Sequence, residues 1–259
     1  MTKQHPIGFF DSGVGGTSIW REVHELLPFE NTIYLADSKN APYGVKSKEE
    51  IIALSFKNTE LLINMGCKII VVACNTATTN AISQLRANFN IPFIGIEPAI
   101  KPAVFASQTK KIGILATKGT INSALFNLSI SKYNDIKFVE KIGTGLVELI
   151  ENGQLQSDET YTLLQKYLQP MIEEDIDFLV LGCSHYPYLI PIIKKIIPNS
   201  IQIIDSGEAV ARQTKNILNE NNLLNEEKIS KQIFFTNGNQ KEVLQTLVSK
   251  KYTVEFLNF

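Results

Sequence analysis

Two of the three cysteines in this 259-residue chain occupy matched positions after apolar, strand-like runs. Cys74 directly follows residues 68–73 and is followed by Asn, Thr and Ala. Cys183 directly follows residues 178–182 and is followed by Ser and His. A lone cysteine is usually buried as a small apolar side chain, but two in equivalent places beside polar residues indicate shared chemistry. Cys67 precedes a strand-like run, lacks such a setting and is assigned no role.

A facing pair of thiols is suited to proton transfer at a carbon stereocentre. The α-proton of an amino acid is very weakly acidic, so its removal needs a thiolate base on one face, a thiol acid on the other and electrostatic stabilisation. An unperturbed thiol pKa of about 8.5 leaves both protonation states within reach near neutral pH. Cys74 and Cys183 are therefore able to exchange the roles of acid and base with the direction of the reaction.

A glycine-rich loop at residues 11–16 offers small polar side chains and backbone amides, the groups that hold substrate carboxylates. It lacks the Lys-Ser/Thr of a P-loop and the full dinucleotide spacing, so it does not predict a nucleotide site. Its three glycines fit a tight strand-to-helix turn at least as well as contact with a ligand. Asp11 is also placed to cap the following helix.

Short apolar and β-branched runs alternate with longer helical patterns along the chain. Strands that are apolar throughout are typical of parallel sheets covered on both faces. The sequence therefore predicts an α/β fold. The strand-like runs lie at residues 7–10, 32–36, 68–73, 92–96, 111–116, 178–182 and 201–204.

A weak internal repeat predicts two homologous parallel-sheet α/β units. The interval from Asp11 to Cys74 is close to that from Ala116 to Cys183, and a further strand follows each cysteine at a similar distance. Open α/β sheets bind ligands beyond the carboxyl ends of their strands. We therefore expect the two units to face each other across a cleft, with the active site at their interface.

The unit boundaries follow from the same repeat. The predicted first unit comprises residues 1–97 and a C-terminal return over residues 207–259. This return begins with a helical run at residues 208–220 and includes a strand at 233–236. The predicted second unit comprises residues 98–206.

Charge and composition exclude several classes of function. The formal net charge is −1 and the basic residues are scattered, which predicts no binding to nucleic acid or to a membrane surface. The N-terminus lacks the layout of a signal peptide and no apolar stretch approaches the roughly 18 residues that span a bilayer, so we expect a cytoplasmic location. Three cysteines and three histidines without metal-ligand spacing predict neither a disulfide framework nor a structural zinc site.

Six short motifs, taken in order along the chain, resemble the glutamate racemases of the aspartate/glutamate racemase superfamily. The resemblance covers residues 7 to about 210, and the set is far more specific than any one motif. It implies glutamate as substrate, no cofactor or metal, a homodimer, and a role in supplying D-glutamate for peptidoglycan synthesis. The motifs are residues 11–16 (DSGVGG), 42–44 (PYG), 74–77 (CNTA), 97–99 (EPA), 116–120 (ATKGT) and 183–187 (CSHYP).

The resemblance also implies roles for individual residues. Cys74 takes the α-proton from D-glutamate and Cys183 takes it from L-glutamate, assisted by Asp11 and His185 respectively. The family usually has Thr where Ser184 stands, so the hydroxyl is kept while a methyl group is lost. The implied substrate contacts are Asp11, Ser12, Tyr43, Gly44, Asn75, Thr76, Thr117, Thr120, Ser184 and His185.

Structural roles stay open for several of these residues. His185 is also placed to cap or pack, Tyr43 to serve as a turn aromatic, and Glu97 to support the site from behind.

Other functions also fit parts of the pattern. A relative acting on aspartate, a hydantoin or a malonate-type acid would share most of it, although paired cysteines disfavour the decarboxylase. Two lobes around a cleft also suit a small-ligand-binding module, for which matched cysteines serve no purpose. Pyridoxal phosphate chemistry is disfavoured because no lysine lies in a recognisable cofactor context.

Overall fold

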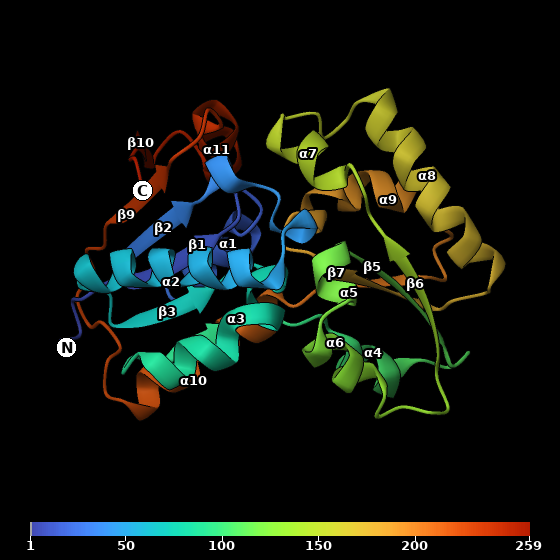
Figure 1. The fold of residues 1–259 in the computed structure, drawn as a ribbon, viewed down its shortest axis with the longest axis horizontal. Coiled ribbons are helices and arrows are strands. Elements are labelled where there is room, and N and C mark those ends of the chain that lie inside the picture. The colour runs from blue at the N-terminus through green and yellow to red at the C-terminus, as the bar shows by residue number, and fades with distance from the viewer. Residues whose placement is uncertain (1) are drawn as a thin grey trace.

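The computed structural model describes residues 2–259 and contains two parallel sheets. The six-stranded sheet has the order β10 (Thr253–Phe256), β9 (Gln232–Thr236), β2 (Thr32–Ala36), β1 (Ile7–Asp11), β3 (Ile69–Val72) and β4 (Phe93–Gly95). The four-stranded sheet has the order β6 (Lys137–Ile142), β5 (Lys111–Ala116), β7 (Phe178–Gly182) and β8 (Gln202–Ile204). Each sheet with its helices forms one lobe, and the two lobes lie side by side (Figure 1). We call them the first and the second unit. The predicted α/β fold of two parallel-sheet units is confirmed.

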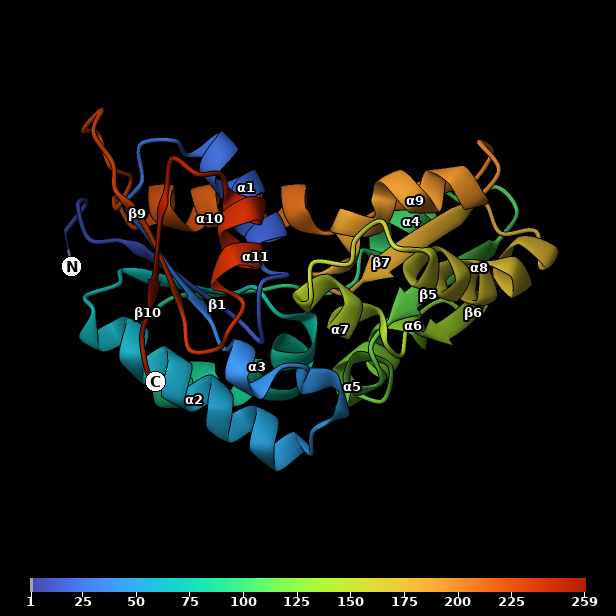
Figure 2. The same ribbon diagram turned by 90° about the horizontal axis from the view of Figure 1, so that it is seen from above.

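Helices cover both sheets, and turned by 90° the molecule again shows two lobes that meet along one boundary (Figure 2). The helices of the first unit are α1 (Thr17–Leu26), α2 (Lys48–Asn64), α3 (Asn75–Asn88), α10 (Gly207–Glu220) and α11 (Lys241–Val248). Those of the second are α4 (Ile100–Ala106), α5 (Lys118–Ile121), α6 (Ala124–Ile130), α7 (Leu146–Glu151), α8 (Asp158–Glu173) and α9 (Ile190–Ile196). Short 3₁₀ turns are η1 (Ser38–Asn40), η2 (Tyr43–Val45) and η3 (Tyr186–Leu189). Within residues 2–259 no helix has the length and apolar character needed to cross a membrane.

The central strands are buried along their whole length, as their continuous apolar sequences predict. Every residue of β1, β3 and β7 is buried. Because β1 pairs with β3 in parallel and β5 pairs with β7 in parallel, the carboxyl ends in each pair lie at one edge of their sheet. Polar residues that follow these strands are thereby brought to the same edge.

Two edge strands, β6 and β10, were not predicted from the sequence. β6 reads KFVEKI and β10 reads TVEF, and both are partly exposed, so neither is apolar throughout. Charged residues are expected on an edge strand because they oppose pairing with another chain. A search for uninterrupted apolar runs therefore finds the central strands and the edge strands β4 and β8, and misses the other edge of each sheet.

The C-terminal residues return to the first sheet. β9 pairs with β2, β10 pairs with β9, and α10 packs against α1. The predicted boundaries at 97/98 and 206/207 fall between β4 and α4 and at the start of α10. The division of the chain into two domains at these boundaries stays a prediction.

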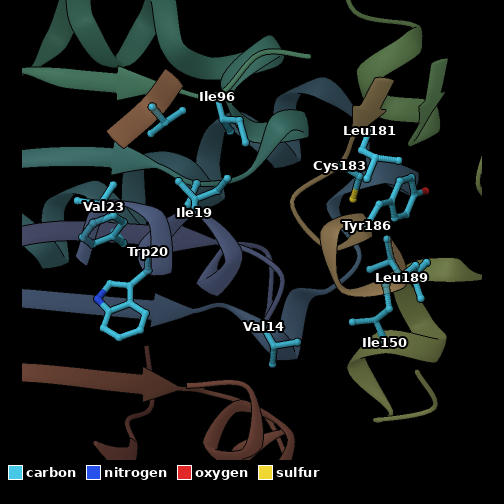
Figure 3. Packing of buried hydrophobic residues seen from close by; sticks show 14 of the residues in the cluster. Val14, Ile19, Trp20, Val23, Ile96, Ile150, Leu181, Cys183, Tyr186 and Leu189 are labelled. Carbon is cyan, nitrogen blue, oxygen red and sulfur yellow. The ribbon is translucent and has the colours of Figure 1, made fainter. Parts of the chain in front are cut away.

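One hydrophobic core cluster crosses the boundary between the two lobes. Figure 3 shows it running from Ile19 and Trp20 on α1 to Leu181, Tyr186 and Leu189 of the second unit. Burial of each large apolar side chain contributes roughly 1.5 to 3 kcal/mol. The lobes are therefore held together by shared core as well as by polar contacts.

A buried ion pair lies at the amino end of β3, on the side of the first sheet opposite the carboxyl ends of its strands. Lys68, directly before β3, has a fully buried side chain whose Nζ lies 2.5 Å from Glu30 Oε2. The same ammonium donates to the carbonyls of Lys3 and Leu223, and Glu30 Oε1 accepts from the amide of Asn225. The pair thus ties the N-terminal segment, the α1–β2 connection and the α10–β9 connection together.

Replacing one partner of this pair should cost far more stability than replacing both. Lys68→Met leaves Glu30 buried without its counter-ion, and we expect the free energy of unfolding to fall by about 3 to 5 kcal/mol. The double variant Lys68→Met with Glu30→Leu should recover most of that loss. Urea unfolding of both variants provides the measurement, and a single variant as stable as the wild type would contradict the prediction.

Candidate active site

Both matched cysteines lie just past central strands and line the same cavity. Cys74 follows β3 and precedes α3, where its Sγ lies 3.4 Å from the amide nitrogen of Ala77. Cys183 directly follows β7. Their exposed fractions are 3% and 6%, so both thiols are screened from bulk water. The fold therefore brings one cysteine from each unit to the wall of one cavity.

This cavity lies between the units and is narrow. It offers about 10 Å³, which is roughly the room that one water molecule requires. Of the predicted catalytic and substrate-contacting residues, Asp11 and Thr120 do not line it and all the others do. The lining residues are Ser12, Pro42, Tyr43, Gly44, Cys74, Asn75, Thr76, Thr117, Val147, Cys183, Ser184 and His185.

Asp11 does not line the cavity but contacts residues that do. Its Oδ1 accepts a hydrogen bond from Ser184 Oγ at 3.1 Å. Its Oδ2 accepts from the amides of Gly13 and Gly16 at 3.2 and 3.0 Å and lies 4.0 Å from His185 Nδ1. The sequence made Asp11 a candidate cap of the following helix, but the N-cap of α1 is Gly16 and, among residues 2–259, no side chain caps it; the Asp11 carboxylate instead holds the loop before α1. It also reaches across the unit boundary to Ser184.

Thr120 supports a cluster of hydroxyl groups. Thr117 Oγ1 lies 2.8 Å from Thr76 Oγ1 and 3.1 Å from Thr120 Oγ1. Thr76 comes from α3 and the other two from the start of α5, so the cluster joins the units. Thr120 orients the two hydroxyls that line the cavity.

A buried glutamate that the sequence analysis missed holds His185. Glu151, the last residue of α7, places Oε1 2.7 Å from His185 Nε2 and 2.6 Å from the amide of Val14. Its Oε2 accepts from Ser38 Oγ at 3.2 Å. Glu151 belongs to none of the six motifs, and one acid at the end of a short helix carries no sequence signal. The role of Glu151 is visible only in the structure, where the two units pack together.

Close approach explains why the loop before α1 is rich in glycine. A Cβ at Gly13 would lie 1.9 Å from Glu151 Oε1, and one at Gly15 would lie 2.1 Å from His185 Nδ1. Among residues 2–259, the glycines with positive φ are Gly66, Gly145 and Gly153, none of which belongs to this loop. Gly13 and Gly15 are therefore required for space beside side chains of the second unit, and Gly16 for space beside Asp11, Tyr34 and Ala73 of the first.

His185 is set up to carry a positive charge. Burial opposes that charge, but the contacts with Cys183 and Glu151 raise the pKa of His185 well above its usual value. Its Nδ1 lies 3.8 Å from Cys183 Sγ. The imidazolium therefore lies where it stabilises negative charge on that sulfur.

Cys74 has a different electrostatic environment. Burial, and then the negative charge of Asp11, raise the pKa of the Cys74 thiol well above its usual range, while backbone amides act in the opposite direction. Burial also raises the pKa of Asp11 itself, against the positive charge of His185. Cys74 therefore favours the protonated thiol, whereas Cys183 lies beside the His185 ring.

In the part of the chain that the structure describes, the side-chain amide of Asn75 is buried without hydrogen-bond partners. Its side chain is 2% exposed, and neither its Oδ1 nor its Nδ2 has a hydrogen-bond partner within residues 2–259. Leaving both ends of a buried amide unsatisfied is costly, so such a group in a cavity wall indicates a polar ligand. An amide is able to hold a carboxylate through its NH₂ and an ammonium through its oxygen.

Tyr43 lines the cavity, and its hydroxyl is hydrogen-bonded to side chains of the first unit. The hydroxyl donates to Asp37 Oδ2 at 2.5 Å and accepts from Asn58 Nδ2 at 3.0 Å. Burial, followed by the charge of Asp37, raises the pKa of Tyr43 well above its usual value. Tyr43 therefore remains a neutral phenol, fixed to the first unit.

Comparisons with known proteins match the sequence and the fold of this chain to glutamate racemases. Over 224 residues the chain is 46% identical to a glutamate racemase from Herpetosiphon aurantiacus, covering 86% of this chain and 88% of that protein. It is 42% identical over 252 residues to one from Clostridium perfringens, covering 96% of each. A glutamate racemase isoform from Bacillus anthracis superposes with a TM-score of 0.88 at 32% identity, covering 98% of each chain. One from Francisella tularensis in complex with D-glutamate gives 0.86 at 29%, also covering 98% of each.

The fold and the site define an amino-acid racemase, an isomerase, as the sequence predicted. The chain belongs to the Asp/Glu/Hydantoin racemase family, whose model matches residues 8–214.

Glu151→Gln should lower the pKa of His185, because the amide no longer stabilises the imidazolium. A shift of roughly 1 to 3 units is the usual effect of one close opposite charge. NMR titration of the His185 ring measures it directly. Glu148→Gln, at an exposed position on the same helix, is the matched control. An unchanged His185 titration in Glu151→Gln would show that this carboxylate does not hold the charge.

Proposed function

We propose that this protein interconverts L- and D-glutamate by proton transfer at Cα, with Cys74 and Cys183 as the two acid/base groups and no cofactor. The observation that carries the proposal is the meeting of two buried cysteines, one from each unit, at one narrow cavity. Such a cavity excludes water from a weakly acidic carbon and strengthens the electrostatic interactions inside it.

Glutamate as substrate is supported by the relatives and by the cavity wall. Glutamate racemases match the chain over nearly its whole length, as in the Clostridium perfringens protein. The unsatisfied amide of Asn75 and the hydroxyls of Thr76 and Thr117 are suitable partners for carboxylates. Two structures, an aspartate racemase homologue and an aspartate racemase, are 17% identical and share the fold alone. Aspartate is therefore the weaker candidate.

In the proposed mechanism Cys74 takes the α-proton from D-glutamate while Cys183 delivers a proton to the other face. In the reverse direction Cys183 takes the proton from L-glutamate. His185 assists Cys183 directly, from 3.8 Å. The hydrogen bonds of Asp11 go to the loop amides and to Ser184, so its assistance to Cys74 acts through charge.

The wider role is carried over from the relatives. We propose that the product D-glutamate supplies peptidoglycan synthesis and that the enzyme works in the cytoplasm as a homodimer. These three statements rest on the family resemblance and stay predictions.

Racemisation in heavy water tests the two-base mechanism. Because the incoming deuteron comes from the opposite cysteine, L-glutamate formed from D-glutamate should carry deuterium from its first appearance. The D-glutamate recovered early should remain unlabelled. Mass spectrometry of the separated enantiomers gives the answer.

The cysteine variants complete this test. Cys74→Ser and Cys183→Ser should each abolish racemisation, because a serine hydroxyl is far less acidic than a thiol, while Cys67→Ser should retain it. Early deuterium in recovered substrate with unlabelled product, or substantial turnover in either active-site variant, would overturn the two-cysteine mechanism.

Asp11→Asn and His185→Asn should slow proton transfer by roughly 10²- to 10⁴-fold with the fold intact. The two enantiomers are equally stable, so kcat/KM must fall equally in both directions. An unequal contribution of each helper therefore appears in kcat and KM taken separately. Steady-state kinetics from both enantiomers, with circular dichroism of the protein as the fold control, measures this. Wild-type rates in both variants would limit the two residues to structural roles.

A further inference from the structure

A second cavity lies at the unit boundary and is lined by three lysines. It has a volume of about 490 Å³ and is formed by η2, the start of α2, α3, α5 and the start of α6. We call it the lysine pocket. Its lining residues are Gly44, Val45, Lys46, Ser47, Lys48, Ile51, Thr79, Asn80, Lys118, Gly119, Asn122, Ser123 and Ala124.

The lysine pocket carries uncompensated positive charge. No carboxylate is among its lining residues, and within residues 2–259 none of Lys46, Lys48 and Lys118 forms an ion pair. Glu50 feels the charge of Lys46, but its carboxylate is taken up by the amide and hydroxyl of Ser47. The whole chain has a net charge of −1, so attraction of an anion depends on such a local group of lysines.

A thin wall separates the lysine pocket from the active-site cavity. Gly44 lines both. A Cβ built on Gly119 would lie 3.3 Å from the Cα of Gly44 and 2.7 Å from Cγ2 of Thr76, so the two units touch here through glycine. Asn80 Nδ2 donates to the carbonyl of Gly119 at 3.1 Å and closes the seam. We call this contact the Gly44–Gly119 seam.

The active-site cavity cannot admit a substrate as it stands. Its 10 Å³ holds about one water molecule, whereas an amino dicarboxylate has ten non-hydrogen atoms. One side of the cavity must therefore open. The Gly44–Gly119 seam is a contact between units at two residues without side chains, so its separation breaks chiefly the Thr76–Thr117 and Asn80–Gly119 hydrogen bonds.

We propose that the lysine pocket is an antechamber that binds the carboxylates of the substrate before it passes the Gly44–Gly119 seam. The proposal rests on the proposed function, because it takes an amino dicarboxylate as the ligand. Glutamate carries two carboxylates and one ammonium, so its net charge of about −1 at neutral pH suits a group of flexible ammonium ions. Exposed lysines bind such an anion loosely and in a salt-dependent way, which permits onward transfer.

Glutarate is the probe for binding, because it keeps both carboxylates and lacks the stereocentre and the amine. At low ionic strength, saturating glutarate should protect Lys46, Lys48 and Lys118 from acylation by an amine-reactive reagent, read by peptide mass spectrometry. Lys194 and Lys195, exposed on α9, should not be protected. Glutaramide, the uncharged analogue, should protect neither group.

Kinetics provide the second readout. We expect the triple variant Lys46→Gln, Lys48→Gln and Lys118→Gln to lower kcat/KM for glutamate by about 10-fold at low salt, the lower end of electrostatic steering effects. The deficit should shrink as salt is added, because screening weakens the wild type as well. The matched control, Lys194→Gln, Lys195→Gln and Lys250→Gln, removes the same charge from elsewhere and should retain the wild-type salt dependence.

The outcomes separate this proposal from the racemase assignment. Lysine protection by glutarate, together with a salt-dependent loss confined to the pocket variant, supports the antechamber. An active wild type with no protection and identical kcat/KM in all three proteins overturns the antechamber and leaves the racemase intact. A wild type that fails to racemise glutamate but shows the protection overturns the racemase and leaves a dicarboxylate-binding pocket.

Discussion

The hydrogen-bonded contact of Glu151 with His185 and with the amide of Val14 is the interaction on which the site depends. It joins α7 and the residues after β7 to the glycine-rich loop of the first unit. A buried carboxylate without such partners would be strongly destabilising, so the contact fixes how the two units meet. With the units held in this way, Ser184 reaches Asp11 and the two cysteines line one cavity.

Two buried carboxylates around one imidazole make the charge of this contact dependent on pH. The pKa of His185 is raised, so its stabilising charge is fully present below the ordinary imidazole pKa and is lost as pH rises through the raised value. The pKa of Asp11 is raised as well, so this carboxylate weakens the folded state once pH exceeds its ordinary pKa. Both effects act in the same direction, and the contact between the units is weakest in alkali.

The sequence was sufficient for the features that depend on local pattern. Continuous apolar runs predicted β1, β3 and β7, and the paired motifs brought Cys74 and Cys183 to equivalent strand ends. Glu151 could not be predicted, because its importance comes from the packing of one unit on the other and not from its own neighbours in sequence. The same holds for Gly13 and Gly15 of the glycine-rich loop, which are explained by Glu151 and His185, side chains more than a hundred residues away in sequence.

The narrow cavity also limits how the two cysteines regain their starting protonation states in the proposed mechanism. Each conversion of D- to L-glutamate leaves Cys74 protonated and Cys183 deprotonated, the reverse of the state that began it. Before the next conversion in the same direction, a proton must leave one thiol and another must reach the second. Room for about one water and exposures of 3% and 6% leave little solvent in contact with the thiols for this exchange. Separation of the units that admits solvent would reset the cysteines at the same time as it exchanges substrate for product.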